Sequence, residues 1–203
     1  MQINTLIAFS IFAFVTSVTP GPNNLMLLAS GVNFGFRLSL PHILGISSGF
    51  FVMVFTVGLG LAEAFILFPQ LYVFLKWVGA AYLLYLAWKI ATSKQLEKNT
   101  TTESANSRPM TFWSAAAFQW VNPKAWVMAV GAFSTYVPAT SGVLIVAFIA
   151  TLFALINAPS VGIWALFGST MRRFLSNEKN FRIFNYGMAL LLVLSLYPIL
   201  HEF

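Results

Sequence analysis

The sequence predicts an all-α integral membrane protein of about six transmembrane helices, arranged as an inverted 3+3 repeat with proline-broken first and fourth helices. Composition is the first reason: 59% of the 203 residues are hydrophobic, only 8% are charged, and the mean hydropathy is +0.81. Soluble domains usually have about a quarter of their residues charged, so this chain could not present a soluble surface. The other reasons are a series of long apolar segments and a polar, proline-containing interruption in each half, at 19–24 and 122–124.

Six apolar segments are each near the roughly 20 residues that cross about 30 Å of hydrocarbon. They cover approximately residues 4–31, 42–67, 71–91, 111–135, 143–168 and 183–201. The first is too long for one straight helix, which fits a break at 20–22. If this break were a re-entrant turn, five full spans would remain and the amino terminus would move to the other side.

The halves match in plan. Pro22 in the first segment corresponds to Pro123 in the fourth, the second segment to the fifth, and the third to the sixth. An odd number of spans in each half places the two copies in opposite orientations. We therefore expect a first three-helix repeat at 1–92, a cytoplasmic polar linker at 93–110 and a second three-helix repeat at 111–203.

The basic residues predict the orientation. They gather in or beside the first, third and fifth connections, at Arg37, Lys89, Lys94, Lys98, Arg108, Arg172, Arg173, Lys179 and Arg182. Cytoplasmic connections of membrane proteins are enriched in Lys and Arg, which places the odd connections in the cytoplasm and both termini outside. The net charge of +6 would suggest nucleic acid in a soluble protein, but here it is explained by topology.

The prolines indicate a polar site inside the membrane. A proline removes the amide bond to the carbonyl four residues earlier, so Pro20 and Pro22 release the carbonyls of Thr16 and Val18. By the same rule Pro123 releases that of Gln119, and Pro159 that of Leu155. Irregular backbone survives at membrane depth only where protein buries it or where it lines a wet cavity, and paired broken helices are typical of a transporter's binding site. The alternative is that the prolines only kink helices for packing.

The predicted substrate-binding residues are those that combine a helix break with buried polar groups: Thr19, Pro20, Gly21, Pro22, Asn23, Asn24, Gln119, Asn122, Pro123, Lys124 and Asn157. Lys124 is the most informative charge, because it lies about 20 Å along its span at 1.5 Å per residue. Beside a half-helix amino terminus it would attract a carboxylate. The competing interpretation pairs it internally with helix carbonyls or places it at an interface.

Few residues could carry other chemistry. The chain has no Asp and no Cys, which excludes disulfides and thiolate metal sites, and His42 and His201 lie far apart. Glu63 is the only acidic residue within a predicted span, and a structural pair with Lys76 is favoured over a proton relay. No nucleotide-binding loop, zinc-protease motif or nucleophile motif is present, so we expect no metal, no cofactor and no enzyme activity.

At several motifs the chain resembles the LysE/RhtB superfamily of amino-acid exporters. The motifs are Thr19-Pro-Gly-Pro-Asn23, the pair Gly45 and Gly49, Gly79-Ala-Ala-Tyr-Leu83 with Trp88-Lys-Ile-Ala-Thr-Ser93, and Phe112 through Asn122-Pro-Lys124. The resemblance covers nearly the whole chain and is closest to the cysteine/O-acetylserine exporter branch. Many relatives carry an Asp just after the second glycine of the pair, where this chain has Phe50.

The resemblance implies a secondary transporter of the bacterial inner membrane that exports small neutral amino acids or related metabolites, driven by the proton gradient. The expected partners are a small amino-acid substrate and membrane lipid but no nucleic acid, and a homo-oligomer is compatible with the sequence. The alternatives are a passive channel and an intramembrane enzyme acting on lipid. The enzyme is disfavoured because no carboxylate pair, histidine cluster or activated nucleophile is available.

Overall fold

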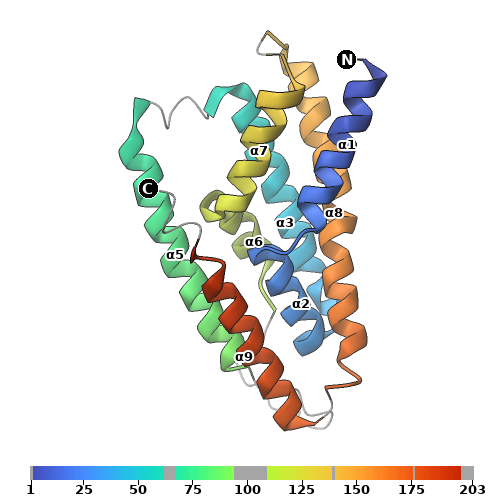
Figure 1. Ribbon diagram of the computed structural model, residues 1–203, viewed down its shortest axis with the longest axis vertical. Coiled ribbons are helices and arrows are strands. Elements are labelled where there is room, and N and C mark those ends of the chain that lie inside the picture. The colour runs from blue at the N-terminus through green and yellow to red at the C-terminus, as the bar shows by residue number, and fades with distance from the viewer. Residues whose placement is uncertain (1, 62–66, 94–108, 139, 176, 198–203) are drawn as a thin grey trace.

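The computed structural model (Figure 1) describes residues 2–61, 67–93, 109–138, 140–175 and 177–197. All regular structure in these residues is helical. The elements are α1 (Ile3–Val18), α2 (Pro22–Phe34), α3 (Phe36–Thr56), the π-helical η1 (Val57–Leu61), α5 (Pro69–Ala91), α6 (Phe112–Phe118), the 3-10 turn η2 (Gln119–Val121), α7 (Pro123–Tyr136), α8 (Val143–Met171) and α9 (Glu178–Leu194). The predicted linker lies mostly outside the described residues.

The first predicted span is broken where the sequence indicates. Helix α1 ends at Val18, α2 begins with Pro22 at its first position, and their axes differ by 55°. Proline suits this position because the first amides of a helix have no intrahelical acceptor. The two helices follow one another along the long axis of the molecule (Figure 1), which favours a bend within one crossing over a re-entrant turn.

The fourth predicted span is broken in the same manner. Helix α6 ends at Phe118, η2 makes one tight turn, and α7 begins with Pro123 at its first position. Asn122 between them is extended, with φ −90° and ψ 107°. This is the backbone that the residue before a proline prefers, because the proline ring disfavours the α region there.

Two helix starts differ from the segments expected from sequence. Helix α3 begins at Phe36, before the expected segment 42–67, and continues through Pro41. A proline so near a helix start removes only one early hydrogen bond. Helix α9 begins at Glu178, because the Asn177 side chain caps it by accepting from the Lys179 amide at 2.9 Å. Helix α8 continues through Pro159, so this proline causes no break.

The number of spans is confirmed only in part. Three helical stretches are long and apolar enough to cross a membrane (Phe36–Leu61, Val73–Ala91 and Val143–Met171), and the bent pair α1–α2 makes a fourth. The predicted fourth and sixth spans do not reach that length in the described residues. The fourth span is divided at η2, and the sixth span, helix α9, is short.

Helix α8 is the centre of the packing and contacts α1, α2 and α3. Its crossing with α2 is backbone against backbone: a Cβ added to Gly31 would overlap the Ala165 carbonyl, and one added to Gly168 would overlap the Leu28 carbonyl. Small residues allow this approach where lipid offers no hydrophobic driving force between helices. At the α1 end of α8, Phe9 and Phe50 meet Phe153 edge to face at 5.4 and 4.8 Å between ring centroids.

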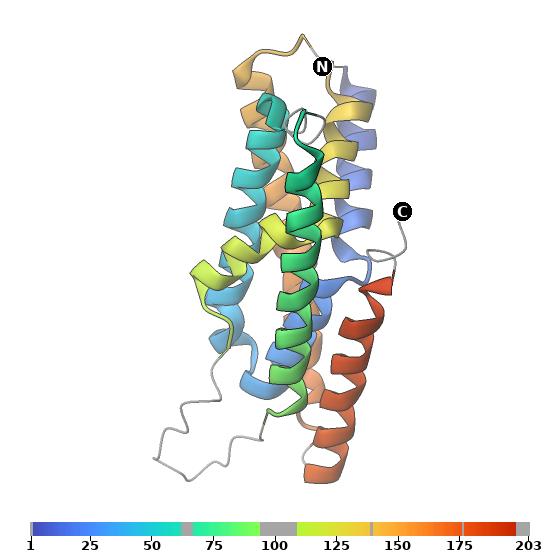
Figure 2. The same cartoon turned by 90° about the vertical axis from the view of Figure 1, so that its left-hand side faces the viewer.

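Helices that correspond in the predicted repeat lie against each other and run in opposite directions. Helix α3 packs on α8, and α5 packs on α9 (Figures 1 and 2). The end of the molecule where α2, α5 and α8 finish and α9 begins also carries most of the basic residues in the described part of the chain: Arg37, Lys89, Arg172, Arg173, Lys179 and Arg182. This arrangement agrees with the predicted orientation, while the repeat and the topology remain predictions.

Candidate functional site

The two helix breaks meet each other. Asn23, in the first turn of α2, and Gln119, at the end of α6, exchange hydrogen bonds: the Asn23 amide donates to Gln119 Oε1 at 2.9 Å and the Gln119 amide donates to Asn23 Oδ1 at 3.3 Å. Gln119 is fully buried and also donates to the Ala115 carbonyl at 2.9 Å. Residues 96 apart in sequence are therefore joined at one point between the halves.

Lys124 makes the second connection. Its ammonium donates to the Thr19 carbonyl at 2.6 Å, to Thr19 Oγ1 at 3.0 Å and to the Pro20 carbonyl at 3.3 Å. These oxygens lie just beyond the carboxyl end of α1, where the helix dipole favours a cation. In this conformation Lys124 therefore pairs internally with backbone carbonyls, as in the competing interpretation from sequence.

The carbonyls released by the prolines have partners within the protein. Thr16 O accepts from the Thr19 hydroxyl at 3.0 Å, Val18 O from the Trp164 indole at 3.0 Å, and Gln119 O from the Asn122 amide at 3.3 Å. In this conformation these three carbonyls are therefore satisfied within the protein. An unpaired carbonyl is costly away from water, which explains why side chains satisfy the first two of these carbonyls and a backbone amide satisfies the third.

The unsatisfied groups at the breaks are acceptors on asparagine side chains. Oδ1 of Asn24, Asn122 and Asn157 is buried and has no hydrogen-bond partner. Ser17 orients two of these amides: its carbonyl accepts from Asn24 Nδ2 at 2.9 Å, and its hydroxyl from Asn157 Nδ2 at 3.1 Å. With the nitrogens used in this way, the oxygens of Asn24 and Asn157 are left for a donor.

These oxygens line one small cavity. Its lining includes seven of the predicted residues, namely Gly21, Asn23, Asn24, Gln119, Asn122, Lys124 and Asn157. The other four do not line it: Thr19 and Pro20 supply the oxygens that bind Lys124, and Pro22 and Pro123 start the two half-helices. The free space of about 20 Å³ is enough for a water molecule but not for an amino acid. The described conformation is therefore closed around the site.

The structure also assigns roles to residues that sequence reasoning did not select, and of these Ser17 and Phe50 line the cavity whereas Trp164 does not. Ser17 is buried and holds two amides, yet a serine in an apolar helix has no distinguishing signal. Trp164 follows Pro159 by five residues with no polar neighbour that would predict its bond to Val18. Phe50, which follows the second glycine of the pair Gly45 and Gly49, lines the cavity as an apolar wall.

Two further predictions have different outcomes. Glu63 lies outside the described residues, so its pairing with Lys76 stays a prediction. Pro159 is exposed on α8, away from the cavity that its neighbour Asn157 lines. Among the described residues, no group of three His, Cys, Asp or Glu side chains could hold a metal ion.

Comparison with known proteins identifies the family. The LysE type translocator family matches residues 14–195. The chain belongs to the LysE type translocators. It is 37% identical over 190 residues to proteins named cysteine/O-acetylserine efflux protein from Escherichia coli (strain K12), Shigella sonnei (strain Ss046) and Shigella flexneri, with 93% of each chain covered. No solved structure shows a significant match.

The matched region of the LysE type translocators includes both helix breaks, the cavity and the paired helices α5 and α9. The resemblance seen in the motifs is therefore confirmed over nearly the whole chain. The family is one of membrane translocators, and this chain is an all-helical membrane protein of that family.

Proposed function

We propose that this chain is a secondary transporter that exports small neutral amino acids or related metabolites, of the cysteine/O-acetylserine or homoserine/threonine type, across the bacterial inner membrane. Its family and the names of its relatives support export of an amino acid. The observation that carries the proposal is the set of three unpartnered amide oxygens between two broken helices. An amino acid supplies the donor that such a site lacks.

The site suits the two charged groups of an amino acid. The ammonium donates to Oδ1 of Asn24, Asn122 and Asn157, which are acceptors only. The carboxylate binds the Lys124 ammonium and the amino ends of the half-helices α2 and α7, where backbone amides favour an anion. A small side chain then faces Phe50 and Met128 on the apolar wall.

Substrate binding requires the site to open. The closed cavity has no room for an amino acid, and the carboxylate competes with the Thr19 and Pro20 oxygens for Lys124. The Asn23–Gln119 pair and the Lys124 contacts join the halves, so these bonds separate and re-form in each transport cycle. Alternating access by rocking of one repeat against the other is common in transporters built from inverted repeats.

The proton-motive force is the proposed energy source. Glu178 is the only acidic residue in the described part of the chain, and it is exposed and bound to Arg182 at 2.6 Å. Proton coupling in these residues therefore depends on groups other than a buried carboxylate.

A passive channel and a lipid-modifying enzyme are the rival functions. A channel needs a continuous wet path, whereas the described residues close around the cavity. An enzyme needs an activated nucleophile or a carboxylate pair, and neither lies near the cavity among the described residues.

An export assay tests the proposal. Cells that produce the chain are compared with cells that lack it, and the amino acids that appear in the medium are measured. We expect O-acetylserine or a related amino acid in the medium, with an export rate that saturates and falls when an uncoupler is added. Asn122→Ala should reduce this export strongly, while the control Asn180→Ala, at an exposed position of α9, should not. Unsaturable flux would indicate a channel, and a chemically altered product would indicate an enzyme.

A further inference from the structure

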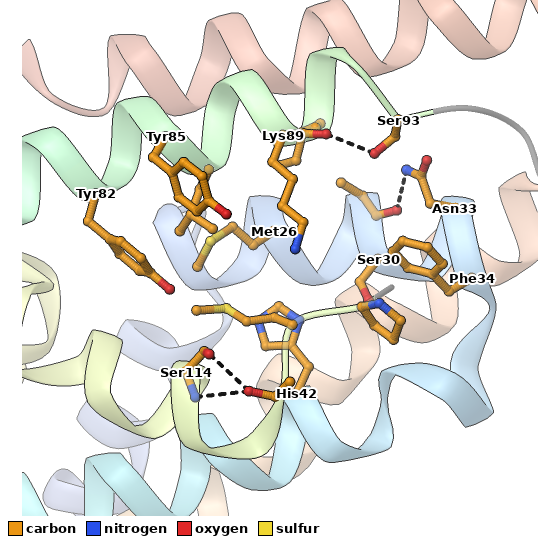
Figure 3. Close-up of a pocket in the computed structure, with 16 residues that line it drawn as sticks. Met26, Ser30, Asn33, Phe34, His42, Tyr82, Tyr85, Lys89, Ser93 and Ser114 are labelled. Carbon is orange, nitrogen blue, oxygen red and sulfur yellow. Dashed lines mark hydrogen bonds between the residues drawn. The ribbon is translucent and has the colours of Figure 1, made fainter. Parts of the chain in front are cut away.

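A second cavity lies beside α2, nearer the basic end of the molecule than the central cavity. It has a volume of about 200 Å³ and is walled by α2, α3, α5 and residues 109–114 (Figure 3). One water occupies about 30 Å³ in the liquid, so the cavity has room for several waters or one small organic molecule. None of its lining residues belongs to the central cavity.

The charged group in this cavity is a lysine. The Lys89 side chain extends from the last turn of α5 into the space between Met26 and Ser30 (Figure 3). Its ammonium makes no hydrogen bond or ion pair with any residue in the described part of the chain, and no Asp or Glu lines the cavity. A cation without a counter-ion in such surroundings favours an anionic ligand.

A buried histidine faces the same space. His42 is 2% exposed, and neither ring nitrogen has a hydrogen-bond partner. Buried polar groups nearly always have one, so an imidazole with both nitrogens open indicates a missing ligand or water. On the opposite wall, Tyr82 and Tyr85 stack with ring centroids 6.0 Å apart. Aromatic faces of this kind can attract an ammonium group.

Helix α2 connects this cavity to the central one. Asn23 of the central site and Met26, Ser30 and Asn33 of the second cavity are spaced i, i+3, i+7 and i+10, which places them on one face of α2. Seven residues separate Asn23 from Ser30, which is about 10 Å along a helix. The two cavities therefore lie one after the other along the same face of α2.

We propose that this second cavity, with Lys89 and His42, is a loading site that binds the carboxylate of the exported amino acid before it reaches the central asparagines. The proposal rests on the proposed export function and on the predicted cytoplasmic position of the basic end. Lys89 and the His42 ring bind the carboxylate, and the tyrosine faces receive the ammonium. The site thereby selects amino acids over amines of similar size.

Transport in inside-out vesicles tests the role of Lys89. Vesicles from cells that produce the full chain expose the cytoplasmic face, and uptake of radiolabelled O-acetylserine is measured as a function of its concentration. Lys89→Gln should raise the half-saturation concentration about tenfold or more, as expected for loss of a charge-assisted hydrogen bond. Lys179→Gln removes an equal charge at the same end of the molecule and should leave it unchanged. Parental half-saturation in Lys89→Gln would overturn the loading site, whereas absence of uptake by the parent would instead contradict the proposed function.

Thiol labelling tests binding independently of transport and leaves Lys89 in place. The chain has no cysteine, so Ser114→Cys introduces a single thiol in the cavity wall. O-acetylserine should slow its reaction with an impermeant maleimide about tenfold at about ten times Kd, by mass action. The carboxamide of O-acetylserine should give no protection, and Lys179→Cys should react at the same rate with or without ligand. Absence of protection at position 114, or equal protection by the carboxamide, would refute the site.

Discussion

Lys124 connects the carboxyl end of α1 to the start of α7, and replacing it with Met tests both of its assigned roles. Methionine keeps most of the length and apolar stem of the side chain but removes the ammonium. Three hydrogen bonds are lost, at 2.6, 3.0 and 3.3 Å. The Thr19 carbonyl keeps its bond from Asn24 at 2.7 Å.

The expected loss of stability follows from these contacts. A hydrogen bond to a charged group contributes about 1.5–3 kcal/mol net. Since one carbonyl keeps a partner and the half-buried ammonium no longer has to be desolvated, we expect Lys124→Met to lower the free energy of unfolding by about 2 kcal/mol. Denaturant titration in detergent measures this value, with Lys179→Met as the exposed control.

Export separates the binding role from the structural one. If the Lys124 ammonium also binds the substrate carboxylate, the half-saturation concentration should rise about tenfold in the fraction of protein that reaches the membrane. Lys124→Ala should lose more stability, and Lys124→Glu should export least because it repels the carboxylate. Lys124→Arg keeps the charge, but its planar fork fits a compact site poorly. A parental half-saturation concentration in Lys124→Met would refute the binding role, and an unchanged free energy of unfolding would refute the structural one.

Reporter fusions after Asn177 should report the cytoplasm and those after Thr140 the outside, since most of the basic residues in the described part of the chain lie at the former end; a cytoplasmic signal at Thr140 would contradict the inverted repeat. Pro123→Ala should insert normally but reduce export strongly, because a continuous helix would remove the break that holds the amide cluster; parental export would leave the proline a packing role only. Gly31→Val should lower the free energy of unfolding by about 3 kcal/mol or more, measured by denaturant titration, because its side chain would overlap the Ala165 carbonyl. Phe50→Ala enlarges the central cavity on its apolar side and should shift export toward larger amino acids in a competition assay. An unchanged preference would place the substrate side chain elsewhere.

The helix breaks could be predicted from sequence because proline and glycine act on the local backbone. Thr19-Pro-Gly-Pro and Asn122-Pro are incompatible with a continuous helix wherever they occur, and both lie where the structure divides the spans. Asn24, Asn122 and Asn157 could likewise be selected, because an asparagine in an apolar span needs a partner or a ligand.

The partners of the backbone could not be predicted, because they depend on packing between distant helices. The bond from Trp164 to the Val18 carbonyl spans 146 residues, and nothing near Trp164 distinguishes it from the other tryptophans of the chain. The same limit applies to Lys124, whose sequence position indicates depth but not whether its ammonium faces α1 or an open cavity. The second cavity was also missed, because Lys89 was interpreted as a topology signal and His42 was considered only as part of a histidine metal cluster, which its distance from His201 in the sequence disfavours.

The glycine crossing of α2 and α8 has a mechanical consequence. Two backbones in direct contact have no side-chain rotamers with which to adjust, so sliding between them requires their separation. We therefore expect α2 and α8 to move as one rigid unit, and the bend at Gly21 to act as the hinge at its upper edge. We then expect the helices on the other side of the cavity, α6 and α7, to move during transport. Their polar links to α2 and to the end of α1 are hydrogen bonds that can be exchanged one at a time.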